Sequence, residues 1–193
     1  MKLLPNTLAS TGRRVIAVAA AAVAGLAIST AAYAATSSAA SPASIPRCTA
    51  SDLGVWVAFD QGNGAAGTIY YPLEFTNLSH HTCYLFGYPG VSALDSNGHQ
   101  LGSPAGWGPR AGAHVVNLAP GATAHTILGY HDVVVGTPPE CGTVRLAVDL
   151  RVFPPGQRSA DHAAFPVEAC VHAGPVYMSI IKPIVPGVGT ING

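Results

Sequence analysis

The sequence predicts an all-β protein, an antiparallel β-sandwich of about eight or nine short strands held by disulfides. Apolar residues recur at every second position in several short segments, which is the period of a half-buried strand. The chain of 193 residues also contains 22 glycines and 16 prolines, which end strands in turns and disfavour long helices. No segment of the domain shows a convincing amphipathic-helix period, and a small β-barrel is the alternative that periodicity leaves open.

Nine strands are expected in the domain. In chain order they cover residues 53–59, 69–75, 83–86, 91–95, 114–118, 122–130, 144–152, 163–170 and 176–182.

The first two of these strands follow from alternation. In the first of them, alternate residues from Leu53 to Phe59 are apolar and share one face. The second alternates from Ile69 to Phe75 but contains Pro72, which cannot donate a ladder hydrogen bond. We therefore expect an edge strand or a bulge at Pro72.

Turn residues separate the middle strands. The bend Gly87-Tyr88-Pro89-Gly90 divides residues 83–86 from residues 91–95, because glycine permits backbone conformations that tight bends need. Ala119-Pro120-Gly121 separates the next pair of strands in the same way. These turns favour antiparallel neighbours.

The clearest alternation follows the third cysteine. The residues expected to face the core are Val144, Leu146, Val148, Leu150 and Val152. The residues expected to face water are Arg145, Asp149 and Arg151. Two further strands, residues 163–170 and 176–182, complete the domain.

The N-terminus is typical of an export signal. Lys2, Arg13 and Arg14 precede an apolar run over residues 15–30, and Ala32-Tyr33-Ala34 matches a signal-peptidase site. We therefore expect cleavage after Ala34 and a secreted, extracellular protein that is associated with the cell wall or free of it. A membrane anchor is the alternative, because the apolar run approaches the length of a spanning helix.

Four parts follow along the chain. They are a signal peptide (1–34), a disordered spacer (35–47), the β-sandwich domain (48–182) and a flexible tail (183–193). Cleavage removes three of nine basic residues and none of nine acidic ones, so the mature net charge is −3. Nucleic acids and anionic lipid surfaces favour clustered positive charge instead. We expect no nucleic-acid partner, no stable membrane insertion after cleavage, and a monomer.

All four cysteines lie in the expected mature chain. In an oxidising compartment an even number of cysteines indicates disulfides, and four cysteines allow three pairings. We expect the sequential pairing, Cys48–Cys83 and Cys141–Cys170. Zinc is the competing interpretation, but no C-x-x-C spacing supports it.

Catalytic signatures are absent from the sequence. There is no G-x-S-x-G elbow and no glycine-rich phosphate loop, and the carboxylates are scattered. We therefore expect a secreted, non-catalytic binding or cell-envelope module without a cofactor, whose partner is an envelope glycan or a protein. A hydrolase of another type is a weaker hypothesis.

The candidate ligand-binding residues are Trp107 and Arg110, in the glycine-rich loop 102–112. A loop tryptophan offers a stacking surface for a sugar ring or a peptide side chain, and sandwich loops commonly bind ligands. The structural alternative is that Trp107 closes the open end of the sandwich.

Eight histidines suggest an alternative function, an extracytoplasmic copper- or zinc-binding protein. The candidate ligands are His125 and His131, which are six residues apart and would share one face of a strand. A metal site needs three or four converging donors, and no run such as H-x-H places two together. Exposed turn histidines are the simpler interpretation.

Several segments resemble a known family. They are C-T-A-S-D-L, G-A-A-G-T-I-Y-Y-P-L-E-F-T-N, T-C-Y-L-F-G-Y-P-G-V, L-D-S-N-G and N-L-A-P-G-A-T-A-H, followed by the Cys141/Cys170 pair. The chain is similar, over about residues 48–182, to the domain-of-unknown-function family numbered 4232, found in secreted and lipid-anchored actinobacterial proteins. The resemblance implies an immunoglobulin-like β-sandwich outside the cytoplasm. It implies no activity, and no catalytic residue carries over.

Overall fold

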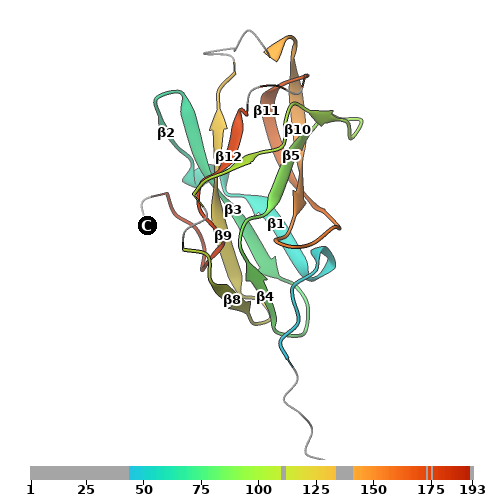
Figure 1. Cartoon of the computed structure of the whole chain (residues 1–193), viewed down its shortest axis with the longest axis vertical. Helices are drawn as coiled ribbons and strands as arrows, with labels where there is room; N and C mark the ends of the chain where they lie inside the picture. The colour runs from blue at the N-terminus through green and yellow to red at the C-terminus, as the bar shows by residue number, and fades with distance from the viewer. Residues whose placement is uncertain (1–43, 110–111, 134–140, 173, 175, 192–193) are drawn as a thin grey trace, which may run out of the picture. The chain divides into compact units, whose positions relative to one another are not determined.

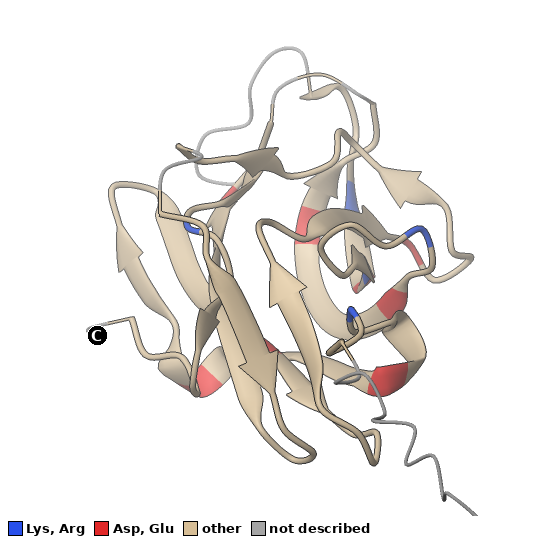
Figure 2. Cartoon of the chain, turned by 60° about the horizontal axis from the view of Figure 1, so that its bottom comes forward, with Lys and Arg blue, Asp and Glu red and all other residues tan. Residues whose placement is uncertain are grey.

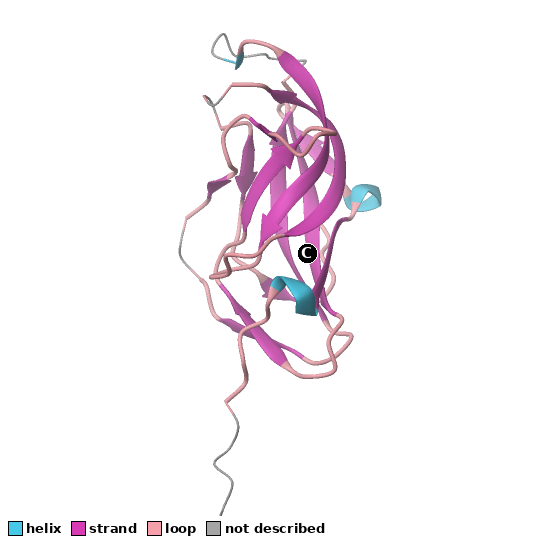
Figure 3. Cartoon of the chain, turned by 90° about the vertical axis from the view of Figure 1, so that its right-hand side faces the viewer, coloured by secondary structure: helices cyan, strands magenta, loops and turns pink. Residues whose placement is uncertain are grey.

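The computed structural model describes residues 44–109, 112–133, 141–172, 174 and 176–191 (Figure 1). The predicted signal peptide, most of the predicted spacer and Arg110 lie outside these ranges. Within them the chain is all-β, with thirteen strands and two three-residue 3-10 segments, Ala50–Asp52 and Phe59–Gln61 (Figure 3). The predicted fold class is therefore confirmed. The strand count exceeds the prediction because five strands contain only two or three residues.

The larger sheet has the strand order β1-β3-β9-β12-β7, with β2 added to β3 and β13 added to β9. Its strands are β1 (Leu53–Val57), β2 (Asn63–Ala65), β3 (Thr68–Asn77), β7 (Gly106–Trp107), β9 (Thr123–His131), β12 (Met178–Ile180) and β13 (Val185–Pro186). Every pairing in this sheet is antiparallel except that of β12 with β7. Most neighbouring strands of this sheet are not consecutive in the chain, so longer connections join them.

The second sheet has the order β11-β10-β5-β6, and a separate two-stranded sheet pairs β4 with β8. The strands are β4 (Cys83–Phe86), β5 (Gly90–Leu94), β6 (Gln100–Leu101), β8 (Val115–Leu118), β10 (Val144–Phe153) and β11 (Asp161–Cys170). Strand β1 of the first sheet packs against β11 of the second. The predicted sandwich is confirmed.

An aromatic cluster lies between the two sheets. Phe165 on β11 is fully buried, and its ring centroid lies 5.7 Å from those of Phe59 and Tyr71 and 5.9 Å from that of Tyr130. Tyr71 belongs to β3 and Tyr130 to β9. Phe165 therefore joins strands of both sheets in one core.

Both predicted disulfides are present. Cys48–Cys83 links the segment before β1 to β4, and Cys141–Cys170 links the segment before β10 to the end of β11. Order begins before Cys48, because Arg47 of the predicted spacer forms a bridge with Tyr84 and places its guanidinium 5.0 Å from the centroid of that ring. The prediction of a disordered spacer is wrong at this end.

Pro72 lies inside the larger sheet, on β3. The ladder of β3 with β2 ends at Tyr70 and its ladder with β1 begins at Leu73, so Pro72 falls between the two partners. Its carbonyl accepts the N–H of Ala58. The predicted edge therefore exists only locally. On the side of β3 that faces β1 and β2, neither strand pairs with residue 72, so no hydrogen bond from its nitrogen is needed.

A β-bulge corrects the predicted faces of β10. The register with β11 shifts between Ala147 and Asp149, so the inward alternation changes from odd to even residues. Leu146 is 58% exposed and Val148 is 37% exposed, whereas Ala147 and Leu150 are buried. The prediction that Leu146 and Val148 face the core is wrong, because alternation in the sequence does not reveal the extra residue.

The predicted flexible tail is largely packed on the domain. We call residues 184–189 the C-terminal strap. Ile184 is fully buried, and Val185 pairs with His125 of β9. The tail prediction is wrong for this segment, because glycine and proline report backbone preferences and not the contacts that a segment makes.

Candidate functional site

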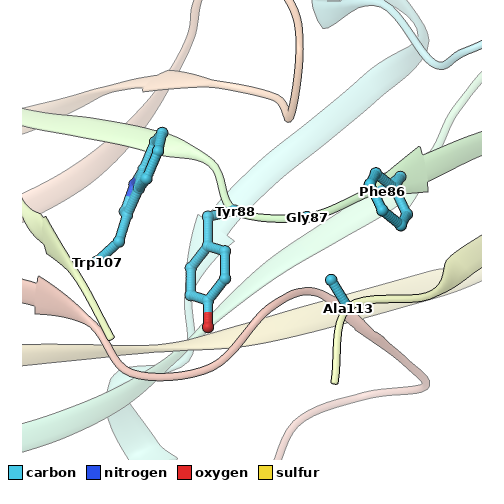
Figure 4. A pocket seen from close by; sticks show the side chains of 5 residues that line it. All are labelled: Phe86, Gly87, Tyr88, Trp107 and Ala113. Carbon is cyan, nitrogen blue, oxygen red and sulfur yellow. The ribbon is translucent and has the colours of Figure 1, made fainter. Parts of the chain in front are cut away.

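A shallow cleft lies where the chain leaves β4 and bends toward β5 (Figure 4). Its volume is ≈ 260 Å³, and the lining residues are Phe86, Gly87, Tyr88, Trp107 and Ala113. Gly87 has a φ of 101°, a conformation that favours glycine, and it begins the bend. On the other wall Trp107 belongs to β7, which pairs with β12. Two segments far apart in the sequence therefore form the cleft.

Trp107 and Tyr88 form a stacked pair, with ring centroids 5.9 Å apart and planes inclined by 30°. The indole Nε1–H of Trp107 donates to the carbonyl of Pro89 at 2.9 Å, and the hydroxyl of Tyr88 donates to the carbonyl of Pro109. Each ring is thus bonded to the segment that carries the other ring. Reciprocal bonds hold both rings in place before a ligand arrives, which lowers the ordering cost of binding.

Two of the aromatic side chains that line the cleft are about half exposed. Trp107 is 50% exposed and Phe86 is 45% exposed. Val115, paired with Phe86 in the two-stranded sheet of β4 and β8, is also exposed and extends the apolar surface. None of the described lining residues is charged. Such a surface binds the apolar face of a ring by stacking and does not select for charge.

Of the two residues predicted to bind a ligand, the structure describes only Trp107. Trp107 lies in the cleft and is half-exposed, so it does not act as a buried plug of the sandwich. Arg110 lies outside the described residues. Phe86 and Tyr88 were not predicted as ligand-binding residues, since strand alternation and bend geometry already explained that segment. The only available signal was an aromatic residue on each side of Gly87.

The other tryptophan, Trp56, does not line the cleft. It lies on β1, opposite Glu74 of β3, on the face of the sheet that points away from Phe75 and Leu73. Trp56 is 41% exposed, close to the value for Trp107. It therefore serves as a matched control for experiments on the cleft.

His125 and His131 are not ligands of one metal ion. Both lie on the continuous strand β9, where six residues of extended chain span about 20 Å. His125 is bonded to the Gly187 carbonyl and His131 to the hydroxyl of Thr68. Among the residues that the structure describes, no group of three or more His, Cys, Asp or Glu side chains could hold a metal ion. His125 and His131 therefore do not form one metal site together, because sharing a strand face does not bring residues close, and the copper- or zinc-binding alternative stays a prediction.

Glu74 was not predicted to have a special role, yet its side chain is completely buried. It lies opposite His125 in the β3–β9 ladder. Its Oε1 accepts the Gly189 N–H at 2.8 Å, and its Oε2 has no hydrogen-bond partner among the described residues. His125 places Nδ1 2.8 Å from the Gly187 carbonyl, which only accepts, so Nδ1 carries a proton. Two neighbouring side chains thus hold two backbone groups of the C-terminal strap.

Burial shifts both groups toward their neutral forms. Burial raises the pKa of the Glu74 carboxyl, and the hydrogen bond from Gly189 offsets this only in part. Burial lowers the pKa of His125, the hydrogen bond to Gly187 opposes that shift, and the charge of Lys182 adds to it. The strap therefore closes most favourably over uncharged side chains.

Replacing Glu74 by glutamine should remove one pH-dependent loss of stability. A carboxyl with a raised pKa in the folded state destabilises the protein as pH rises above its ordinary pKa of 4.5, and the loss is complete above the folded-state pKa. Glutamine keeps an acceptor for the Gly189 N–H and cannot ionise. Relative to Glu74→Gln, the wild type should lose about 1.4 kcal/mol for each pH unit between the two pKa values.

Urea unfolding of both proteins from about pH 4 to pH 8 measures this difference. The titration of His125 is present in both proteins, so it largely cancels from the comparison. A free-energy difference that stays constant across this pH range would show that Glu74 does not titrate differently in the folded state.

Comparison with known proteins gives one match. The family described as "Domain of unknown function (DUF4232)" matches residues 48–179. Neither the curated proteins nor the solved structures contain a match. No helix in the described ranges is long and apolar enough to cross a membrane.

Proposed function

Because the chain belongs to the DUF4232 family, whose description states no activity, we propose its function from the cleft: it is a secreted, non-catalytic carbohydrate-binding module of the cell envelope. The observation that carries the proposal is the half-exposed Trp107, stacked on Tyr88 and bonded in place. Trp56 is exposed to a similar extent, but only Trp107 lines the cleft and is stacked on a second aromatic ring.

The extracytoplasmic location is supported by two features. The chain forms two disulfides, which persist in oxidising compartments and are rare in the cytosol. The N-terminal 34 residues carry the charge, apolar run and small-residue pattern of an export signal. A protein exported with this domain meets the glycans of the envelope.

A neutral sugar ring fits the cleft better than a peptide. The cleft volume of ≈ 260 Å³ lies below the range of drug-sized pockets, roughly 300–1,000 Å³, and suits one ring. The Trp107 Nε1–H already donates to Pro89, so it is not free for a peptide carbonyl as polyproline recognition requires. A sugar can stack its C–H face on the rings while its hydroxyls stay in contact with water at the open side.

The described lining also favours binding over catalysis. It consists of aromatic, glycine and alanine residues, and the one hydroxyl among them, on Tyr88, is bonded to Pro109. General acid–base catalysis needs a titratable group near the reacting atoms, and the one such group among these described residues, the Tyr88 hydroxyl, is already bonded to Pro109. Figure 2 shows several of the charged residues close together on the right-hand side of the view, whereas none of the described residues that line the cleft is charged.

Replacing Trp107 by alanine should weaken binding of a neutral oligosaccharide about thirtyfold, since a central aromatic anchor contributes about 2 kcal/mol. The probes are soluble tetramers of N-acetylglucosamine, glucose and mannose, titrated by calorimetry against the mature protein. Trp56→Ala should bind with unchanged affinity, because Trp56 has a similar exposure but lies outside the cleft.

Equal loss of affinity in both tryptophan variants would rule out the cleft as the binding site. Absence of binding to every tetramer by the wild type would count against a neutral glycan ligand. Both variants must retain the wild-type circular dichroism spectrum, because only then does the comparison report on the cleft.

A further inference from the structure

The C-terminal strap reaches the cleft itself. The Ile184 N–H donates to the carbonyl of Gly87 at 2.9 Å, and Gly87 is the lining residue between Phe86 and Tyr88. The Ile184 side chain is fully buried, so this end of the strap is anchored in the core. The backbone position of the bend therefore depends on where the strap lies.

The other end of the strap is held by polar contacts. Gly187 donates its N–H to the Thr123 carbonyl and accepts from His125, and Gly189 donates to Glu74. Contact at Gly189 is close: a Cβ there would lie 2.7 Å from Cδ2 of His125 and 2.7 Å from Cβ of Pro72. Only a residue without a side chain fits this position while the strap is closed.

Little apolar burial supports the strap between these ends. Pro186 and Gly187 are exposed and Val188 is 69% exposed. Segments held by few buried apolar contacts open more easily than core strands. Glu74 is buried, and one of its oxygens has no hydrogen-bond partner among the described residues, which costs free energy. The core lies on the opposite face of β3, so packing of the core does not require the burial of Glu74.

We propose that the C-terminal strap is a releasable clasp that sets the shape of the cleft, with Glu74 and His125 as positioning residues that hold the clasp closed. When the strap is closed, Ile184 fixes Gly87, and the bend presents Phe86 and Tyr88 in their stacked arrangement. When the end at Gly187 and Gly189 opens, the buried side chain of Ile184 alone holds the strap, so the hydrogen bond from Ile184 to Gly87 weakens and the cleft loosens. As regulation of ligand binding, this role rests on the proposed function; as a structural coupling, it can be tested without any ligand.

The test is Gly189→Ala, which adds a methyl group at the closest contact of the strap. Amide hydrogen exchange should show at least a tenfold loss of protection at residues 184, 187 and 189, with the β3–β9 ladder unchanged. In a Trp56→Phe background, acrylamide should quench the fluorescence of Trp107 more strongly in the variant, since the bend that packs on it is loosened. Exchange at Gly87 and Tyr88 should rise with it.

Gly64→Ala is the matched control. A Cβ at residue 64 would make only ordinary contacts, 3.7 Å from the Thr68 carbonyl oxygen and 3.9 Å from Ile69, so the strap and the cleft should not change. If Gly189→Ala fails to fold, His125→Phe replaces it, because phenylalanine keeps a ring there but cannot donate to Gly187. A severalfold loss of strap protection is then expected.

Two results would overturn the inference. In one, the strap amides stay protected in Gly189→Ala, or in His125→Phe where that variant is needed, so no clasp exists at this contact. In the other, the strap opens while Trp107 quenching and exchange at Gly87 remain as in the wild type, so the cleft is independent of it. Failure of every sugar to bind would refute the proposed ligand and leave both measurements of the clasp unaffected.

Discussion

Phe165→Ala is expected to lower the free energy of unfolding by about 3–5 kcal/mol, the range for truncating a fully buried phenylalanine. Its ring lies within 6 Å, centroid to centroid, of Phe59, Tyr71 and Tyr130. Truncation removes ring contacts from both sheets at once and leaves a cavity that rigid strands cannot close. The loss is comparable to about half of the stability of a typical domain.

Urea unfolding at pH 7, with a Phe86→Ala control, measures this effect. The control makes the same chemical change at a residue that is 45% exposed, so its cost should be about 1 kcal/mol or less. Equal losses in the two variants would show that the aromatic cluster is not the centre of the core.

Replacing Cys48 and Cys83 together by alanine is expected to cost about 4 kcal/mol. The disulfide closes a loop with a sequence separation of 35, and its removal enlarges the unfolded ensemble. In the folded state the same region would keep the backbone hydrogen bond from Cys48 N–H to the Tyr84 carbonyl. The loss should therefore come mainly from the unfolded chain, with the native structure largely retained.

The matched variant replaces Cys141 and Cys170, which close a slightly shorter loop with a separation of 29. The chain-entropy model gives the two disulfides nearly equal contributions, to within about 0.5 kcal/mol. Chemical unfolding of both variants checks this. A loss below about 1 kcal/mol for Cys48 and Cys83 would mean that the disulfide strains the native state or that the unfolded chain is already restricted.

Alternation and turn residues were sufficient to predict the fold class. Both depend on local backbone geometry: side chains alternate along a strand, and glycine and proline end it wherever it occurs. The same local rule failed on β10, where one extra residue between Ala147 and Asp149 reverses the faces. A bulge depends on the partner strand, so a pattern within one strand cannot reveal it.

The candidate site was predicted only at Trp107. A tryptophan in a glycine-rich loop is visible in the sequence, but its neighbours Phe86 and Tyr88 are close to it only because β7 and the Gly87 bend meet in space. Glu74 looked like an ordinary outward residue of a strand. Its burial requires the strap, which arrives from a position 115 residues away.

The sequence by itself determined the all-β class, the presence of disulfides and the family, because these follow from local periodicity, cysteine count and motif order. Only the tertiary structure decided which side chains line the cleft, which face of β10 is inward and where the C-terminal strap lies. The reason is that each of these depends on contacts between segments distant in the chain, and such contacts leave no pattern in either segment alone.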